Sequence, residues 1–322
     1  MVDERTIAQY KKEAVDKGRD SWWLAYVMDI NEEEKAKGKT VEVGRATLTT
    51  PKIRYTIFDA PGHKNYVPNM IQGASCADFA CLVISARKGE FEAGFEREGQ
   101  TREHAQLAKA LGVQRIICVV NKMDDCNWKI ERWNEIREKV IPFLHGCGYT
   151  DNDITWVPIS GLQGENFKTK TTKCDWYEGS SLLDVLDTMQ IPERDENKPL
   201  RIPILDKMTD RGVMVFGKVE QGKVEVGTKI MIAPSCFPAQ VLSIFNSKEE
   251  LVRYAKPGEN VKLRLGGLTD ESQVRKGEVI CPREDTLPIT EIFIAEIKLL
   301  NLLEHKPIMS QGYKSILHIH TI

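Results

Sequence analysis

The chain has 322 residues, of which 41% are hydrophobic and 29% are charged, a balance typical of folded globular proteins. The 45 Lys and Arg residues nearly balance the 47 Asp and Glu residues, which excludes a generally basic coat for nucleic acid and gives no support for specific DNA binding. No run of about 18 apolar residues occurs, and the charged N-terminal segment lacks the apolar core of a signal peptide. These features predict a cytoplasmic protein with no membrane partner.

The first half of the sequence alternates between helix and strand patterns. A charged helix is expected at 3–19, followed by a mobile polar loop at 31–40. Segments with strand patterns, two of them near-continuous apolar runs typical of strands buried on both faces, lie at 52–59, 79–86, 114–121 and 154–160. The helices expected between and after them lie at 101–111, 129–145 and 181–189. This alternation predicts βαβ units and a parallel sheet, with ligand-binding loops at the carboxyl ends of the strands.

The second half has a different pattern, of short strand-like runs separated by glycine turns, which predicts a small antiparallel β-barrel. The charged, proline-containing segment that precedes it reads as a linker. A partial third β unit is expected from strand patterns at 291–300 and 313–322. The predicted divisions are therefore an α/β domain at 1–190, a linker at 191–199, the barrel at 200–285 and the partial unit at 286–322.

Three short motifs follow expected strands in the first domain. They are Asp59-Ala60-Pro61-Gly62-His63, Asn121-Lys122-Met123-Asp124 and Ser160-Gly161-Leu162. Each motif alone is weak, because each occurs by chance in many chains. In this order, each at the end of a strand, they predict a guanine-nucleotide site.

The second and third motifs suit the guanine base. The Asp124 carboxylate can accept hydrogen bonds from guanine N1–H and from its amino group, and it would face an acceptor if adenine were bound. Asn121 can bridge loops and meet the base edge, while the Lys122 stem can lie over the ring with its ammonium group hydrated. Ser160 and Gly161 can supply a backbone N–H for the guanine carbonyl.

The first motif suits the phosphates. Asp59 occupies the position of a Walker-B acid, which holds Mg²⁺ directly or through water. Gly62 allows its own N–H to approach a γ-phosphate closely, because it has no side chain. His63 then lies next to the place where an attacking water would stand.

These motifs, with the linker and barrel behind them, resemble the translational GTPases of the elongation factor 1-alpha group. Within that group the chain is similar to the eukaryotic release factor 3 family over KGKTVEVGRA (37–46), DAPGHKNYVPNMIQGAS (59–75), LVISARKGEFEAGFEREGQTREHAQLAKALGV (82–113) and GYKSILHIHT (312–321). Elongation factor 1-alpha itself normally has an isoleucine-rich stretch where this chain has TVEVGR. A ribosome-rescue or elongation-type GTPase is the alternative within the group.

The resemblance implies a GTP hydrolase that assists the class I release factor on the ribosome at stop codons, with GTP or GDP and Mg²⁺ as ligands. Thr40 would be the switch I threonine that reaches Mg²⁺ and the γ-phosphate, and His63 would orient the hydrolytic water. Leu162 would belong to the guanine-binding loop with Ser160 and Gly161. The class I release factor would dock mainly on the third domain.

The sequence departs from this group at both ends. No G-x-x-x-x-G-K-[ST] phosphate loop occurs, and Gly38-Lys39-Thr40 does not qualify because Glu33 stands where the first glycine is needed. The resemblance places that loop, with the first strand, before Met1, so the expected fold is a P-loop-NTPase-like GTPase domain without either. The third barrel of the group would need more strands than the two expected at 286–322, which puts partner binding in doubt.

The missing phosphate loop has an energetic consequence. Losing about 4 kcal/mol of phosphate contacts weakens binding roughly a thousandfold. We therefore expect this chain to bind GTP feebly and to hydrolyse it negligibly. The alternative function, from a different class than a GTPase, is a binding module that does not recognise nucleotide.

Overall fold

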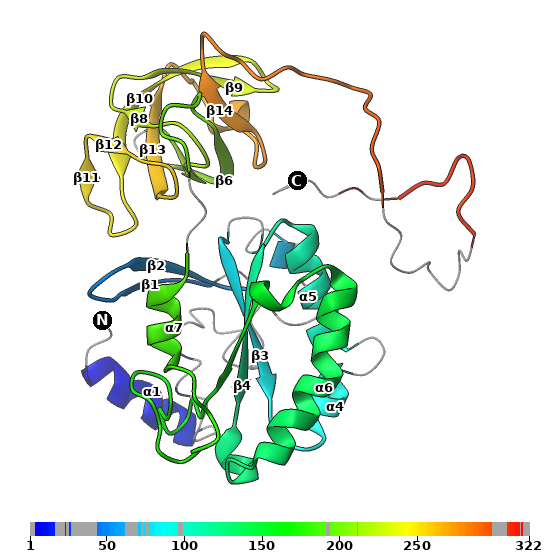
Figure 1. Ribbon diagram of the computed structural model, residues 1–322. Coiled ribbons are helices and arrows are strands. Elements are labelled where there is room, and N and C mark those ends of the chain that lie inside the picture. The colour runs from blue at the N-terminus through cyan, green and yellow to red at the C-terminus, as the bar shows by residue number, and fades with distance from the viewer. Residues whose placement is uncertain are drawn as a thin grey trace. The chain divides into compact units, whose positions relative to one another are not determined.

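The structure, a computed structural model, describes residues 4–16, 23, 26, 44–61, 70–71, 74, 77–95, 99–190, 194–210, 212–297, 308–315 and 317 (Figure 1). It divides into two compact units, Met1–Glu193 and Arg194–Ile322. The first unit contains helices and two small sheets, and the second contains the barrel.

A three-stranded parallel sheet forms the centre of the first unit. Its strands, in the order β3-β4-β5, are β3 (Phe79–Ser85), β4 (Arg115–Asn121) and β5 (Ile154–Pro158). Ile84 lies opposite Val120, and Val119 lies opposite Val157, so the carboxyl ends of the strands meet at one edge. The parallel arrangement expected for these three segments is confirmed.

The helices expected between and after these strands are also present. They are α5 (Gln100–Ala110) and α6 (Ile130–Cys147) between the strands and α7 (Leu182–Thr188) after β5. The short helix α4 (Glu90–Phe95), which was not expected, follows β3. The N-terminal helix expected at 3–19 appears as α1 (Glu4–Asp16). The loop expected at 31–40 lies outside the described residues.

The central strand β4 is buried on both faces, which explains its continuous apolar run. Ile116, Cys118 and Val120 belong to a core shared with buried residues of α5 and α6. Ile117 and Val119 belong to a second core, shared with α7. This two-sided burial is the arrangement that an apolar run without alternation predicts.

Strand β3 differs from this expectation. Leu82 and Ile84 are buried, but Cys81 is exposed and the Val83 side chain is 59% exposed. Among the described residues, the second core includes residues of β4, β5 and α7 but only Phe79 of β3, so the rest of this face is left uncovered. The prediction that β3 is buried on both faces is therefore wrong for one face.

The segment 52–59 also differs from the prediction. It forms β2 (Arg54–Asp59), which pairs antiparallel with the unexpected strand β1 (Gly44–Thr49), and in the described part of the chain neither strand joins the parallel sheet. Side chains connect this hairpin to the rest of the unit. The hydroxyls of Thr50 and Tyr55 both donate to Asp187 Oδ1 of α7, at 2.6 and 3.1 Å.

The second unit contains a closed antiparallel barrel, as expected. Its ring follows the order β10-β13-β7-β6-β14-β9 and closes because β9 also pairs with β10. The six strands are β6 (Ile202–Thr209), β7 (Val213–Lys218), β9 (Lys229–Ala233), β10 (Phe237–Phe245), β13 (Asn260–Gly266) and β14 (Val279–Pro282). Short strands beside the ring are β8 (Val224–Glu225), β11 (Leu251–Val252) and β12 (Tyr254–Ala255).

Alternation and irregular register let the barrel close. Val261, Leu263 and Leu265 of β13 are all almost fully buried in one core, and the residues between them are partly exposed. Register shifts interrupt β6 and β10, and such bulges allow a sheet to curl. Gly217 is required where β7 crosses close to β6, because a Cβ there would lie 2.6 Å from the Pro203 carbonyl oxygen.

The expected third β unit is not formed in the part of it that the structure describes. Residues 291–297, 313–315 and 317 contain no strand, although strands were predicted at 291–300 and 313–322. The side chains of Ile292 and Ile294 are 85% and 102% exposed. Unpaired strands are marginal in water, which explains why strand propensity alone produces no strand in these described residues.

Candidate functional site

The side chain of Asn121 joins the loops after β4 and β5. Asn121, the last residue of β4, accepts hydrogen bonds at Oδ1 from the backbone N–H of Lys122 at 2.7 Å and of Gly161 at 2.8 Å. A Cβ on Gly161 would lie 3.3 Å from the same oxygen, so the two loops approach as closely as a glycine permits. Asn121 thus has the bridging position expected of it.

Asp124 lies in a turn that is held in place by a buried residue and a backbone hydrogen bond. The turn is a 3₁₀ helix (Met123–Cys126) whose first residue is fully buried, and the Met123 N–H donates to Ile159 O at 3.2 Å. The Asp124 carboxylate accepts a hydrogen bond from Gln163 Nε2 at 3.3 Å. Gln163 follows the third motif directly and was not predicted, because only the fold brings it to Asp124.

Lys122 is in the left-handed region, with φ of 62°, and its ammonium group contacts Glu90 Oε2 at 2.7 Å. Glu90, the first residue of α4, also accepts hydrogen bonds from Ser85 Oγ at 2.8 Å and from Arg87 at 3.1 Å. The hydrogen bond from Lys122 is the largest cause that lowers the pKa of Glu90 below its usual value. Glu90 belongs to none of the three motifs and was not predicted.

The third motif uses most of its own backbone donors. The Ser160 N–H donates to Glu165 O at 3.2 Å, and the Gly161 N–H is engaged by Asn121. Among the described residues, the Leu162 N–H has no acceptor, and the Leu162 side chain is 65% exposed. The donor expected of Ser160 or Gly161 is therefore available only at Leu162 in this structure.

The first motif lies apart from this assembly in the sheet topology. Asp59 is the last residue of β2 and pairs with Gly44 of β1, in the hairpin rather than in the parallel sheet. Gly62, His63 and Thr40 lie outside the described residues. The structure thus brings together the residues of the second and third motifs.

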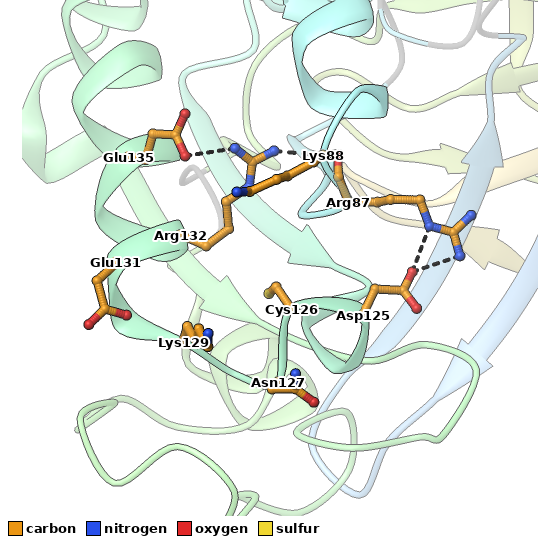
Figure 2. A pocket seen from close by; sticks show the side chains of 9 residues that line it. All are labelled: Arg87, Lys88, Asp125, Cys126, Asn127, Lys129, Glu131, Arg132 and Glu135. Carbon is orange, nitrogen blue, oxygen red and sulfur yellow. Dashed lines mark hydrogen bonds and ion pairs between the residues drawn. The ribbon is translucent and has the colours of Figure 1, made fainter.

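A cavity of about 560 Å³ lies beside the Asp124 turn (Figure 2). Its lining residues are Arg87, Lys88, Asp125, Cys126, Asn127, Lys129, Glu131, Arg132 and Glu135. Most of the charges are paired within the protein: Arg87 contacts Asp125 at 2.8 Å, and the buried Arg132 contacts Glu135 at 2.7 Å. Arg132 also donates to Ala86 O and contacts Glu92, so it fixes the end of β3 and α4.

Two kinds of feature are absent from the part of the chain that the structure describes. In the described ranges, no group of three or more His, Cys, Asp or Glu side chains could hold a metal ion. In the same ranges, the helices are too short or too polar for any of them to span a membrane.

Comparison with known families identifies the class of the protein. The family described as "Elongation factor Tu GTP binding domain" matches residues 2–192, and "Elongation factor Tu domain 2" matches residues 212–281. The chain therefore belongs to the elongation factor Tu GTP-binding domain family. The fold class expected from the sequence, an α/β GTPase-type domain followed by an antiparallel barrel, is confirmed.

The curated relatives are more specific. Proteins from Candida maltosa and Candida albicans, each named "Eukaryotic peptide chain release factor GTP-binding subunit", are each 47% identical over 324 aligned residues. A protein of the same name from Kluyveromyces lactis is 45% identical over 325 residues. These alignments cover 99% of this chain but only 45%, 45% and 46% of the relatives, so the chain spans less than half their length.

Solved structures support the fold. The Ski7 GTPase-like domain of S. cerevisiae, bound to GDP and inorganic phosphate, matches with a TM-score of 0.73 at 18% identity, covering 88% of this chain and 70% of that chain. A bacterial selenocysteine-specific elongation factor matches with a TM-score of 0.63 at 27% identity, covering 80% of this chain and 41% of that one.

Proposed function

We propose that this chain is the guanine-nucleotide-binding part of a cytoplasmic translation-termination GTPase of the release factor 3 type, which acts with the ribosome and a class I release factor. One observation carries this proposal: Asn121 locks the loops of the second and third motifs together, in a chain 47% identical to release-factor GTP-binding subunits. In this proposal the Asp124 carboxylate, the Lys122 stem and the Leu162 backbone N–H would surround the guanine base.

The base would be read by side chains and backbone of these two loops. Asp124 would accept from guanine N1–H and the 2-amino group, replacing its contact with Gln163. The Leu162 N–H would donate to the guanine carbonyl, because the Ser160 and Gly161 donors are already used. Lys122 would cover one face of the ring with its stem.

The phosphate side is a proposal from the sequence. Asp59 would hold Mg²⁺, a cation that prefers oxygen ligands and that would neutralise phosphate charge when bound. Thr40 and Gly62 would contact the γ-phosphate region, and His63 would orient the attacking water. Because the chain has no G-x-x-x-x-G-K-[ST] segment, we expect a GDP dissociation constant of about 1 mM and negligible hydrolysis.

A nucleotide titration followed by NMR tests the proposal. The unmodified chain should bind GDP more tightly than ADP, with shifts confined to the loops after β4 and β5. The Asp124→Asn variant should lose GDP and gain xanthosine diphosphate, because an amide can donate to the carbonyl that xanthine carries in place of the amino group. Equal binding of GDP and ADP, or binding of neither, would indicate a nucleotide-blind binding module instead.

A further inference from the structure

The side chain of Lys122 is fixed at both of its ends. At the backbone end, the Lys122 N–H donates to Asn121 Oδ1 at 2.7 Å, and the residue holds a left-handed conformation that side-chain-bearing residues seldom adopt. At the other end, the ammonium group contacts Glu90 Oε2 at 2.7 Å. The four-carbon stem is therefore restrained at both ends.

Glu90 is itself held in place, unlike a carboxylate in an ordinary surface ion pair. Ser85 Oγ donates to the same oxygen that meets Lys122, and Arg87 contacts the other oxygen at 3.1 Å. Arg87 in turn contacts Asp125 of the Asp124 turn at 2.8 Å. The chain of contacts thus starts and ends on the loop after β4, and it passes through the end of β3 and the start of α4.

Helix α4, which carries Glu90, is anchored by a second set of contacts. Arg132, only 5% exposed, donates to Ala86 O at 2.8 Å and contacts Glu92 at 2.9 Å (Figure 2 shows its neighbouring bond to Glu135). These bonds fix both the segment before α4 and the helix itself to α6. The position of the Glu90 carboxylate is consequently set by the fold and not by Lys122 alone.

We propose that Glu90 is a positioning residue of the base site, which restrains the Lys122 stem on which a purine ring would stack. The inference rests on the proposed function and adds to it a residue outside the recognised motifs. A stem that is ordered before the ligand arrives costs less to order on binding. The stem contacts the ring face and not its edge, so the contribution is the same for any purine of similar shape.

A double-mutant cycle tests this proposal by NMR titration of the full chain with GDP and with inosine diphosphate, which lacks the 2-amino group. The Glu90→Gln variant should bind both nucleotides about fivefold more weakly. The Lys122→Met variant keeps an apolar stem without the ammonium group, and in that background Glu90→Gln should change neither affinity. The ratio of the GDP affinity to the inosine diphosphate affinity should stay constant in the Glu90→Gln and Lys122→Met variants. This ratio should be lost only in Asp124→Asn.

Two further variants keep the test interpretable. Glu131→Gln removes an equal charge from the wall of the neighbouring cavity and should leave both affinities within twofold of the unmodified chain. Glu90→Asp keeps the charge but shortens its reach, and it should lose part of the affinity. The amide spectrum of each variant shows whether it is folded.

The outcomes separate the inference from the function on which it rests. Unchanged or tighter binding by Glu90→Gln, or an equal loss in the Lys122→Met background, would overturn the positioning role while guanine binding stands. Failure of the unmodified chain to bind either nucleotide would overturn the proposed function, and the inference with it.

Discussion

The two units of this protein stabilise their β-strands in different ways. In the barrel, each of the six ring strands has a hydrogen-bonded neighbour on both sides, because β9 pairs with β10 and closes the ring. In the described part of the first unit, the parallel sheet has three strands, and the β1–β2 hairpin is linked to α7 by the side chains of Thr50, Tyr55 and Asp187. Backbone pairing is shared by many residues, whereas a side-chain link depends on a few.

The difference shows where the first unit can change shape. The hairpin is held by the Thr50 and Tyr55 hydroxyls on Asp187 and by the Tyr55 ring, which packs against Phe79 of β3. These are side-chain contacts, so the hairpin can separate from α7 without breaking the backbone hydrogen bonds of the parallel sheet. Asp59 ends this hairpin, so its position depends on the same contacts. The loops after β4 and β5, by contrast, extend from strands that are paired along their length.

The largest expected effect comes from a matched pair of core substitutions. Leu263→Ala in the barrel and Leu144→Ala in α6 each remove a fully buried leucine and should destabilise their own unit by about 3 kcal/mol. All six tryptophans lie within residues 1–193, so tryptophan fluorescence reports on the first unit alone, while circular dichroism reports on both. Urea titrations should show a lower fluorescence midpoint for Leu144→Ala only.

The same two substitutions can also show that the two units are not independent. If Leu263→Ala lowers the fluorescence midpoint as much as Leu144→Ala does, the two units unfold together and are not independent. Val83→Ala, at a residue of β3 that is 59% exposed, is a suitable control and should change neither midpoint by much.

A smaller, local effect is expected at the hairpin link. Asp187→Asn removes the charge from the acceptor shared by Thr50 and Tyr55, and hydrogen bonds to charged groups contribute about 1.5–3 kcal/mol. Amide hydrogen exchange should accelerate in β1 and β2 and stay unchanged in β3, β4 and β5. Acceleration across the whole unit would show that the hairpin and the sheet open as one.

The same link makes a prediction about Tyr55. Burial, with the hydrogen bond to Asp187, raises the pKa of Tyr55 to about 12. Its contribution to stability is therefore present below about pH 10 and is lost as the pH rises through about 12. Burial also raises the pKa of Tyr177 to about 12, so the alkaline loss should be reduced but not abolished in Tyr55→Phe. An undiminished loss in an unfolding series would assign it to another group.

The smallest expected effect is an acidic one in the contacts of Arg132. The hydrogen bond from Arg132 is the largest cause that lowers the pKa of Glu92 to about 2. The associated stability is present above about pH 4.5 and is lost as the pH falls toward 2. Glu92→Gln should flatten this part of the fluorescence-detected stability profile, and an unchanged profile would contradict the assignment.

The sequence was sufficient for the elements whose periodicity is strong. The apolar run of β4 predicted a strand buried on both faces, and the helix expected at 129–145 is present as α6. The strand-and-glycine pattern after residue 200 likewise predicted the barrel. These patterns reflect which side chains of one segment are buried, and the order of apolar and polar residues in that segment shows this directly.

Pairing and neighbourhood were harder to predict. Strand periodicity located β2 but could not show that its partner is β1, because GRATLT alternates only between exposed and half-buried residues. Glu90 and Gln163 belong to no motif, and only the approach of α4 and of the loop after β5 brings them to Lys122 and Asp124. For Glu90, the one sequence signal was an acidic residue in the segment that directly follows the expected strand β3.

The closed ring has a consequence for how this protein can vary. Because its last strand, β14, ends at Pro282 with both neighbours in place, the barrel needs no residue from beyond that point to complete its sheet. Asp285 still contacts Arg201 at 3.0 Å, so insertions, deletions or recombination beyond Asp285 carry little energetic penalty for the barrel. Residues 286–290 are therefore a junction at which the more C-terminal residues can be exchanged while the second unit stays intact.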